Sequence, residues 1–397
     1  IIMTGLLLFA LFRTANAFLY QPGSGGQIWD PSVTWWRGRW YTHAMYQYPG
    51  DPTNVYKSGW LATSSDGVHW EDGGAVAIEA AGNMWWKGFV RQIRGEASNK
   101  TDDALFIMDH GVYEPGKGND ALRFLTSRNL KDWDLNSTSH PDARWYHTGG
   151  RWDHMYMSKH PDGGFIGMAV SSPTVSGFAR TWAGVQRSVD GSTWTQHPPL
   201  NVTWNGVSPT SIEEGGFERM RLPDGTEKYY LIGGGGGHGM AYSMWVFSSD
   251  KIDGPYSPVV AGFRLSGGTG PVSGHFGWLA AWCGPNCDGK ADGTPLISNY
   301  ITARNDARAD VWILPMRQPM VDTQGRLRLG YWTGNDALQG ESKAINDTGV
   351  VTCEQDQNTN VVWIGSFNAT EHAVGAVIVA TLTISGSGFI GIALEDF

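Results

Sequence analysis

The sequence is poor in cysteine and in charged residues. Only three cysteines occur among 397 residues, and charged side chains make up 17%. Three cysteines are too few for a small fold held together by disulfides. Cys283 and Cys287 can close a short loop in an oxidising compartment, which leaves Cys353 unpaired or bonded outside this sequence. A metal site is the competing interpretation, but a single close pair argues against it, and we predict no metal or other cofactor.

Clusters of basic residues are also missing. The formal net charge is −9, and no run of Lys and Arg is interleaved with aromatic residues. A negative chain without such a patch repels a phosphate backbone. Nucleic acid is therefore not expected as a partner.

The apolar run at the N-terminus is too short to span a bilayer. Residues Met3–Phe12 are mostly apolar and are followed by Ala15-Asn16-Ala17. This pattern predicts a secretory signal peptide over residues 1–17, and a buried β-strand is the alternative. Export is also favoured by five glycosylation sequons, which begin at Asn99, Asn136, Asn201, Asn346 and Asn368. We expect a secreted glycoprotein with no membrane association after signal cleavage.

Glycine and aromatic residues are abundant. The chain has 54 Gly, 20 Trp, 14 Tyr and 15 Phe. Such a composition favours many short strands joined by tight turns and argues against a helical bundle. The prediction is an all-β fold.

A repeat of about 62 residues organises most of the chain. The segment Ser64–Trp70 recurs at Ser127–Trp133, at Ser188–Trp194 and, more loosely, at Ser248–Tyr256, so the final aromatic advances by 63, 61 and 62 residues. Ser, Asp, Asn and Gly favour a tight turn, and the aromatic is expected to pack on a neighbouring sheet, as in the outer hairpin of a propeller blade. The spacing predicts a five-bladed β-propeller over residues 18–335. The expected blades are 27–80, 88–140, 148–200, 212–262 and 272–332.

The composition changes after about residue 335. Residues 336–360 are polar and rich in Gly, Asp, Asn and Gln, which is typical of a linker. Asn360–Phe367 and Gly375–Ile384 then resemble strands. For residues 336–397 we predict a linker and a partial or truncated β-sandwich, with a short appended sheet as the alternative.

Three carboxylates occupy equivalent positions at the starts of predicted inner strands. Asp30, Asp153 and Glu214 each precede a turn by eight or nine residues, in blades one, three and four. In a closed propeller, such positions converge at one mouth of the central channel. Singly, each has an ordinary explanation as a turn residue, a surface ion pair or a solvated glutamate. The shared phase favours a common function.

Hydrolysis of a glycosidic bond requires such a set. One carboxylic acid protonates the leaving oxygen, and one carboxylate attacks the anomeric carbon or activates water. Asp30 and a glutamate supply this pair, while Asp153, kept ionised by Arg151, contacts sugar hydroxyls and stabilises the transition state. Glu214 has the best phase, and Glu218 is the second candidate if Gly215-Gly216 forms a bulge. Glu213 remains a third alternative.

Aromatic side chains near these carboxylates are candidate sugar platforms. They are Trp29, Trp85, Trp86 and Trp152. For any single tryptophan the competing interpretation is core packing between blades. His147, His154 and His275 are candidates for hydrogen bonds to hydroxyls, although structural roles are the commoner use of histidine.

The order of these motifs resembles glycoside hydrolase family 32, which includes invertases and fructan hydrolases. The resemblance covers about residues 27–332. It rests on Trp29-Asp30-Pro31, Tyr41–Gln47, Ser64–Trp70, Arg151-Trp152-Asp153, the glutamates of Ile212–Met220, Leu314-Pro315 and Leu329–Trp332. It implies a retaining mechanism with Asp30 as nucleophile, Asp153 as transition-state stabiliser and the glutamate as acid/base. The set of expected sugar contacts becomes Trp29, Gln47, Trp85, Arg151 and Trp152.

Two motifs depart from the family pattern. Its Asn-Asp-Pro-Asn sequence is here Trp29-Asp30-Pro31-Ser32, and its Glu-Cys-Pro sequence is replaced by Glu214-Gly-Gly-Phe-Glu218. The leading prediction is a secreted retaining enzyme that cleaves fructosides or related furanosides. One alternative is an inverting arabinofuranosidase or xylosidase like those of family 43, which shares the fold and an Asp, Asp, Glu set. Others are a non-catalytic sugar-binding propeller and a purely structural one.

Overall fold

The structure is a computed structural model in which most of the propeller region is described. It describes residues 2–4, 20–50, 58–76, 83–87, 89–94, 103–114, 118–174, 182–203, 213–237, 240–260, 264–267, 275–283, 295–305, 308–338 and 381–383. The expected cleavage site after Ala17 and most of the predicted linker and sandwich lie outside these residues. Within the described part of the chain, no helix is long and apolar enough to cross a bilayer.

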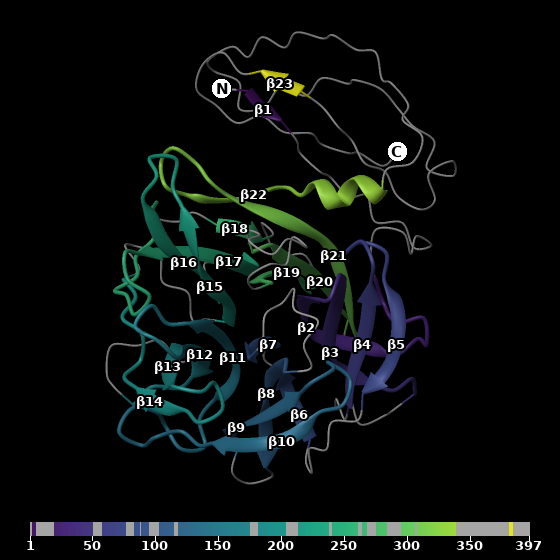
Figure 1. Ribbon diagram of the computed structural model, residues 1–397, viewed down its shortest axis with the longest axis vertical. Helices are drawn as coiled ribbons and strands as arrows, with labels where there is room; N and C mark the ends of the chain where they lie inside the picture. Colours follow the sequence, from purple (N-terminus) through teal and green to yellow (C-terminus); the bar gives the residue numbers. More distant parts are fainter. Residues whose placement is uncertain are drawn as a thin grey trace.

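Five antiparallel sheets form the blades of a propeller and surround a common centre (Figure 1). Blade one contains β2 (Gln27–Trp36), β3 (Arg39–Gln47), β4 (Ser58–Ser64) and β5 (Glu71–Val76). Blade two contains β6 (Asn83–Lys87), β7 (Arg91–Arg94), β8 (Leu105–Glu114), β9 (Gly118–Ser127) and β10 (Asp134–Ser139). Blade three contains β11 (Trp152–Lys159), β12 (Phe165–Ser171), β13 (Trp182–Ser188) and β14 (Thr195–His197).

The last two blades follow the same order. Blade four contains β15 (Glu213–Arg221), β16 (Glu227–Gly237), β17 (Met240–Ser249) and β18 (Arg264–Gly267). Blade five contains β19 (His275–Trp282), β20 (Ile297–Asn305), β21 (Arg308–Val321) and β22 (Leu327–Tyr331), and the 3₁₀ helix η1 (Thr333–Leu338) follows it. The predicted all-β, five-bladed propeller is confirmed.

Two predicted blade boundaries are wrong. Blade two begins at Asn83, not at residue 88, because two short strands share its inner position: β6 pairs with His110–Tyr113 of β8 and β7 with Leu105–Ile107. The predicted boundary fell at the break between them. Blade four extends to Gly267 because β18 pairs with the first half of β17, beyond the expected end at residue 262.

The repeated turn joins the third and fourth strands of blades one to three, as predicted. In each copy a serine Oγ accepts the N–H of the residue three positions on, at 2.8 Å: Ser64 from Gly67, Ser127 from Leu130 and Ser188 from Gly191. The φ values of Gly67, Leu130 and Gly191 are 81°, 63° and 80°, in the left-handed region that favours glycine.

The aromatic residue that ends the turn packs on the preceding blade. Trp133 of blade two lies edge-on to His43 of blade one, with ring centroids 5.5 Å apart. Trp194 of blade three stacks on Phe124 of blade two at 5.8 Å. The repeat therefore fixes the contact between successive blades as well as the hairpin.

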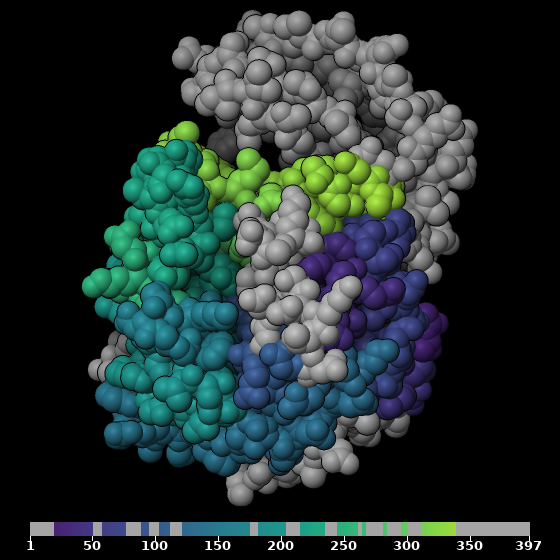
Figure 2. Space-filling model, viewed as in Figure 1, coloured from purple at the N-terminus to yellow at the C-terminus, as the bar shows by residue number. Residues whose placement is uncertain are grey.

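The hydrophobic core lies between blades. One cluster joins blades one and two, a second joins two and three, a third joins three to five, and two more join blade one to blade five. Closure of the ring involves Tyr20, whose backbone exchanges two hydrogen bonds with Ile313 of β21 at 3.0 and 3.1 Å. Trp40 also meets Trp332 at 5.9 Å. In the space-filling view, the purple first blade lies beside the yellow-green segment that follows β20 (Figure 2).

Among the described residues, one further strand pairing lies outside the propeller. The short strand β1 (Ile2–Thr4) pairs antiparallel with β23 (Thr381–Thr383). β23 falls inside the strand predicted at Gly375–Ile384. The signal peptide and the C-terminal β-sandwich stay predictions.

Candidate active site

Three of the predicted catalytic carboxylates lie at a break in the register of an inner strand. The register of β2 with β3 shifts between Trp29 and Ser32, on either side of Asp30. The register of β11 with β12 shifts directly after Asp153, and that of β15 with β16 directly after Glu214. A β-bulge re-aims the side chains next to it, and bulges are common beside active sites. These inner strands, β2, β11 and β15, face the centre of the ring (Figure 1).

Asp30 adopts a backbone conformation that is uncommon for a residue with a side chain. Its φ is 47°, in the left-handed region that Asp and Asn tolerate better than most residues. The Tyr300 hydroxyl, from β20 of blade five, donates a hydrogen bond to Asp30 Oδ1 at 3.2 Å. The bulge and this hydrogen bond orient a half-buried carboxylate. Sequence reasoning missed Tyr300, because no local motif links it to Asp30.

Asp153 is fully buried and held between two cationic or potentially cationic partners. Arg151 Nε donates to Oδ2 at 2.6 Å, and His154 Nδ1 lies 3.1 Å from Oδ1. Burial by itself raises the pKa of Asp153, but Arg151 and His154 outweigh that effect and hold the pKa below its ordinary value. The predicted Arg151–Asp153 pair is therefore present, and Asp153 is ionised at neutral pH.

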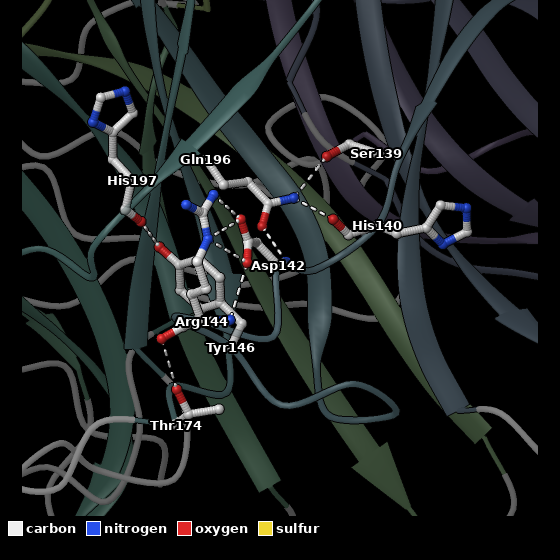
Figure 3. Close-up of polar contacts among 8 residues, drawn as sticks. All are labelled: Ser139, His140, Asp142, Arg144, Tyr146, Thr174, Gln196 and His197. Atoms are coloured by element: carbon white, nitrogen blue, oxygen red, sulfur yellow. Dashed lines mark hydrogen bonds and ion pairs between the residues drawn. The ribbon is translucent and has the colours of Figure 1, made fainter.

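The connection from β10 to β11 holds Arg151 in place. Figure 3 shows this connection tied to β14: Gln196 Oε1 accepts the backbone N–H of Asp142 at 2.5 Å, and the Tyr146 hydroxyl donates to the His197 carbonyl at 2.6 Å. At its far end, the Arg151 N–H donates to Ser172 Oγ at 2.8 Å. Blade three thus fixes the segment that delivers Arg151 and Asp153.

The glutamate region contains the bulge that the second candidate required. Gly215 and Gly216 lie in the register break between Glu214 and Phe217, and Gly216 has a φ of 83°. The side chains of Glu213 and Glu214 lie outside the described residues, although their backbones pair with Gly234 and Gly233 of β16.

Glu218 has two close partners from other blades. Its Oε1 accepts hydrogen bonds from Arg91 Nη2 and from the Tyr156 hydroxyl, each at 2.5 Å. The Glu218 side chain is 12% exposed and that of Arg91 is 9% exposed. Glu218 is therefore engaged in a buried ion pair. Sequence reasoning missed Arg91 and Tyr156.

The proposed sugar contacts fall into different environments. Trp29 is half-buried and packs against two core clusters, and Gln47 is buried at the end of β3. Trp152 is completely buried, with its ring 4.7 Å from that of Tyr146, so we assign it to core packing and not to sugar contact. The Trp85 side chain lies outside the described residues. His154 contacts Asp153, whereas His147 is exposed on the connection to β11.

Among the described residues, no group of three or more His, Cys, Asp or Glu side chains is arranged to hold a metal ion. Cys283 is disulfide-bonded. Cys287 and Cys353, its two possible partners in this chain, lie outside the described residues, so the pairing stays a prediction.

The chain shares its fold with glycoside hydrolases. It aligns with fructan 1-exohydrolase IIa from Cichorium intybus at a TM-score of 0.59 and 13% identity, over 84% of this chain and 63% of the exohydrolase. It aligns with a thermostable family-43 glycoside hydrolase at a TM-score of 0.52 and 13% identity, over 79% of this chain and 95% of that enzyme. A third structure, a putative exo-β-1,3-galactanase from Bifidobacterium bifidum s17, gives 0.53 and 12% identity, over 79% of this chain and 96% of that one.

These likenesses are structural only. No family model matches the chain, and no curated protein matches its sequence. At 12–13% identity the glycoside hydrolases establish the fold and no more. The function must therefore be argued from the residues of the site.

Proposed function

We propose that this protein is a retaining glycoside hydrolase that cleaves fructosides or related furanosides. The observation that carries the proposal is the register break shared by Asp30, Asp153 and Glu214 at the starts of three inner strands. Register shifts occur in other strand pairs as well, but in β2, β11 and β15 each one falls beside a predicted catalytic carboxylate. This placement suits side chains that act together at one mouth of the channel.

In the proposed mechanism, Asp30 Oδ attacks the anomeric carbon while the Glu214 carboxylic acid protonates the departing oxygen. The glycosidic bond breaks, and a covalent glycosyl ester forms on Asp30. Glu214, now a carboxylate, takes a proton from water, and the hydroxide attacks the anomeric carbon. The ester bond breaks, which releases the sugar and the Asp30 carboxylate and leaves Glu214 protonated.

Asp153 has a separate part in this mechanism. Because Arg151 keeps it ionised, Asp153 supplies a buried negative charge that stabilises positive charge developing at the sugar ring. Tyr300 orients Asp30 through its hydrogen bond to Oδ1. The Tyr300 hydroxyl can keep this hydrogen bond both when Asp30 is a carboxylate and when it forms the glycosyl ester.

Fructosides are the first substrates to test. The sequence resemblance to family 32 and the structural likeness to a fructan 1-exohydrolase, one variant of which has been solved in complex with 1-kestose, both support this choice. The family-43 likeness spans 95% of that enzyme and supports the second candidate, an inverting arabinofuranosidase or xylosidase.

The test is hydrolysis of sucrose, inulin, levan and aryl α-L-arabinofuranosides by the wild type and by Asp30→Ala. The proposal expects turnover of at least one substrate and its loss in the variant. Sugar binding without turnover would instead identify a sugar-binding propeller. With methanol as acceptor, a retaining enzyme forms a methyl glycoside of the substrate's own anomeric configuration, whereas an inverting enzyme gives no such transfer product.

We also propose that residues 1–17 direct export. Expression with and without this segment tests the proposal. Secretion that requires residues 1–17, with a mature N-terminus at Phe18, supports it, and retention of the full-length chain in cells would contradict it.

A further inference from the structure

A buried ionic cluster joins three blades beside the glutamate region. Arg91 of β7, Tyr156 of β11 and Glu218 of β15 belong to the inner strands of blades two, three and four. Arg91 Nη2 donates to Glu218 Oε1 at 2.5 Å and to the Tyr156 hydroxyl at 3.0 Å, and Tyr156 donates to the same Glu218 oxygen. Arg91 Nε donates to the Met157 carbonyl at 2.5 Å. The proposed mechanism uses none of these contacts.

This arrangement is an expensive way to gain stability. Removing two charges from water is unfavourable, and well-packed apolar residues often stabilise a fold equally well. Fully connected polar groups, by contrast, fix the geometry of the strands that carry them. Burial is the largest cause that raises the pKa of Tyr156, so its hydroxyl stays protonated and keeps donating to Glu218.

The cluster is packed directly against the bulge that precedes it on β15. Gly216 has a φ of 83°, and a Cβ at this position would overlap the Tyr156 ring. Glu214 lies two residues before Gly216, and Glu218 lies two residues after it. The Tyr156 ring thus packs against Gly216 within the bulge, and the ion pair of Glu218 anchors β15 two residues after it.

Tyr156 also connects two of the three strands that carry proposed catalytic carboxylates. It follows Asp153 by three residues on β11, while its ring contacts Gly216 and, edge-on at 5.5 Å, Phe217 of β15. A shift of this ring would displace the backbone next to Glu214 relative to Asp153. The spacing between the Glu214 backbone and Asp153 therefore depends on this contact.

We propose that Arg91, Tyr156 and Glu218 are positioning residues that hold the Gly215-Gly216 bulge and so aim Glu214 at the leaving-group oxygen. The inference rests on the proposed function and deepens it. It assigns Glu218 to the support of the acid/base and not to proton transfer itself.

The test compares leaving groups. General-acid assistance matters for a poor leaving group such as phenol and little for 2,4-dinitrophenol, which departs without a proton. The probes are the phenyl and 2,4-dinitrophenyl glycosides of β-D-fructofuranose and α-L-arabinofuranose. For Tyr156→Phe and Glu218→Gln, we expect kcat/KM on the phenyl glycoside to fall about tenfold or more, with less than about a threefold change in kcat/KM on the dinitrophenyl glycoside. The ratio kcat/KM is used because it reports the first, glycosylating step and not the later step in which Glu214 acts as a base.

Two further variants calibrate this result. Glu214→Gln should show the same leaving-group selectivity with a larger loss. Asp253→Asn removes the 2.6 Å ion pair between Asp253 and Arg187, which links blade three to the segment after β17. This pair lies away from the proposed catalytic carboxylates, so the variant should leave the ratio of the two rates unchanged. Tyr156→Phe keeps the ring that packs on Gly216, so it tests the hydrogen-bond network even if Glu218→Gln does not fold.

Three outcomes would overturn the inference. Equal losses on both glycosides, or none, would mean that the cluster is only structural. A selective loss in Glu218→Gln with no selectivity in Glu214→Gln would make Glu218 the acid itself. A wild type that hydrolyses neither pair of glycosides, nor sucrose, inulin or levan, would refute the proposed function, a result that is distinct from equal losses in an active enzyme.

Discussion

Gly111 of β8 lies against Asp153 of β11, and a Cβ added at Gly111 would come within 2.9 Å of the Asp153 Cβ. Blade two therefore leaves room for the carboxylate of blade three only because residue 111 has no side chain. The contact crosses a blade interface and involves a residue that carries no chemistry of its own. The position of Asp153 therefore depends on packing against blade two as well as on its own blade three.

Gly111→Ala should lower activity more than stability. Overpacking typically costs about 1–3 kcal/mol, and here the group that must yield is the buried carboxylate. We expect kcat/KM to fall at least about tenfold, because a displacement of about 1 Å at a reacting group costs up to about a hundredfold. The matched control is Gly73→Ala, whose Cβ would approach the Leu61 carbonyl at the same 2.9 Å, but in the outer strand β5. Equal activity losses in the two variants would contradict the assignment.

Arg151→Ala should move the acid limb of the pH–activity profile to higher pH. Asp153 acts as a carboxylate, so activity is present above its pKa and is lost as the pH falls through it. Burial raises this pKa and Arg151 lowers it, so removal of the guanidinium raises it. The measurement is kcat/KM against pH, which reports groups of the free enzyme. Arg151→Lys, which keeps the charge, should shift the limb less, and an unmoved limb in Arg151→Ala would contradict the role of Asp153.

Leu130→Gly should destabilise the fold even though it relieves backbone strain. Leu130 occupies the left-handed position at which two other copies of the turn have Gly67 and Gly191, and a non-glycine residue there costs about 1–2 kcal/mol. Its side chain is fully buried between blades one and two, and loss of a buried leucine costs about 2–5 kcal/mol. Urea unfolding should show a net loss of about 1–3 kcal/mol. A gain in stability would mean that backbone strain outweighs packing at this turn.

Asp322→Asn should lower stability at neutral pH and much less in acid. Burial raises the pKa of Asp322, but hydrogen bonds from Arg326, Arg328 and Gln324 outweigh it and lower the pKa from 3.8 to about 2. A folded-state pKa below the unfolded value stabilises the protein above the unfolded pKa, and the effect is lost as pH falls through the folded one. The shift corresponds to about 2 kcal/mol at pH 7.

The acid range provides the measurement for Asp322. The difference in unfolding free energy between wild type and Asp322→Asn should shrink by about half between pH 7 and pH 3. Asp162→Asn, at a turn carboxylate whose side chain is 92% exposed, serves as the control and should change little at either pH. A difference that stays constant with pH would show that Asp322 acts through packing alone.

The repeat explains why the fold could be predicted. The turn Ser64–Trp70 and its copies depend on local hydrogen bonds and on one aromatic residue, so their chemistry is visible in the sequence. Their constant spacing then defines the blades. The break between β6 and β7 was missed because nothing local marks it, since both strands pair with a single longer strand.

The candidate site could be predicted only in part. Arg151 and Asp153 are two residues apart, and their ion pair follows from sequence. Tyr300 lies 270 residues from Asp30, and Arg91 lies 127 residues from Glu218, so only the closed ring brings these pairs together. Trp152 was expected to contact sugar, but it is completely buried and packs against the Tyr146 ring.

The most direct test of the account is the turnover of Asp30→Asn. Asparagine tolerates the left-handed backbone of residue 30 and can still accept the Tyr300 hydrogen bond, so the variant should fold with an unchanged Tm. We predict that the wild type hydrolyses a fructoside or another furanoside and that kcat of the variant falls by about a thousandfold or more. Comparable kcat values for the two proteins on that substrate would contradict it.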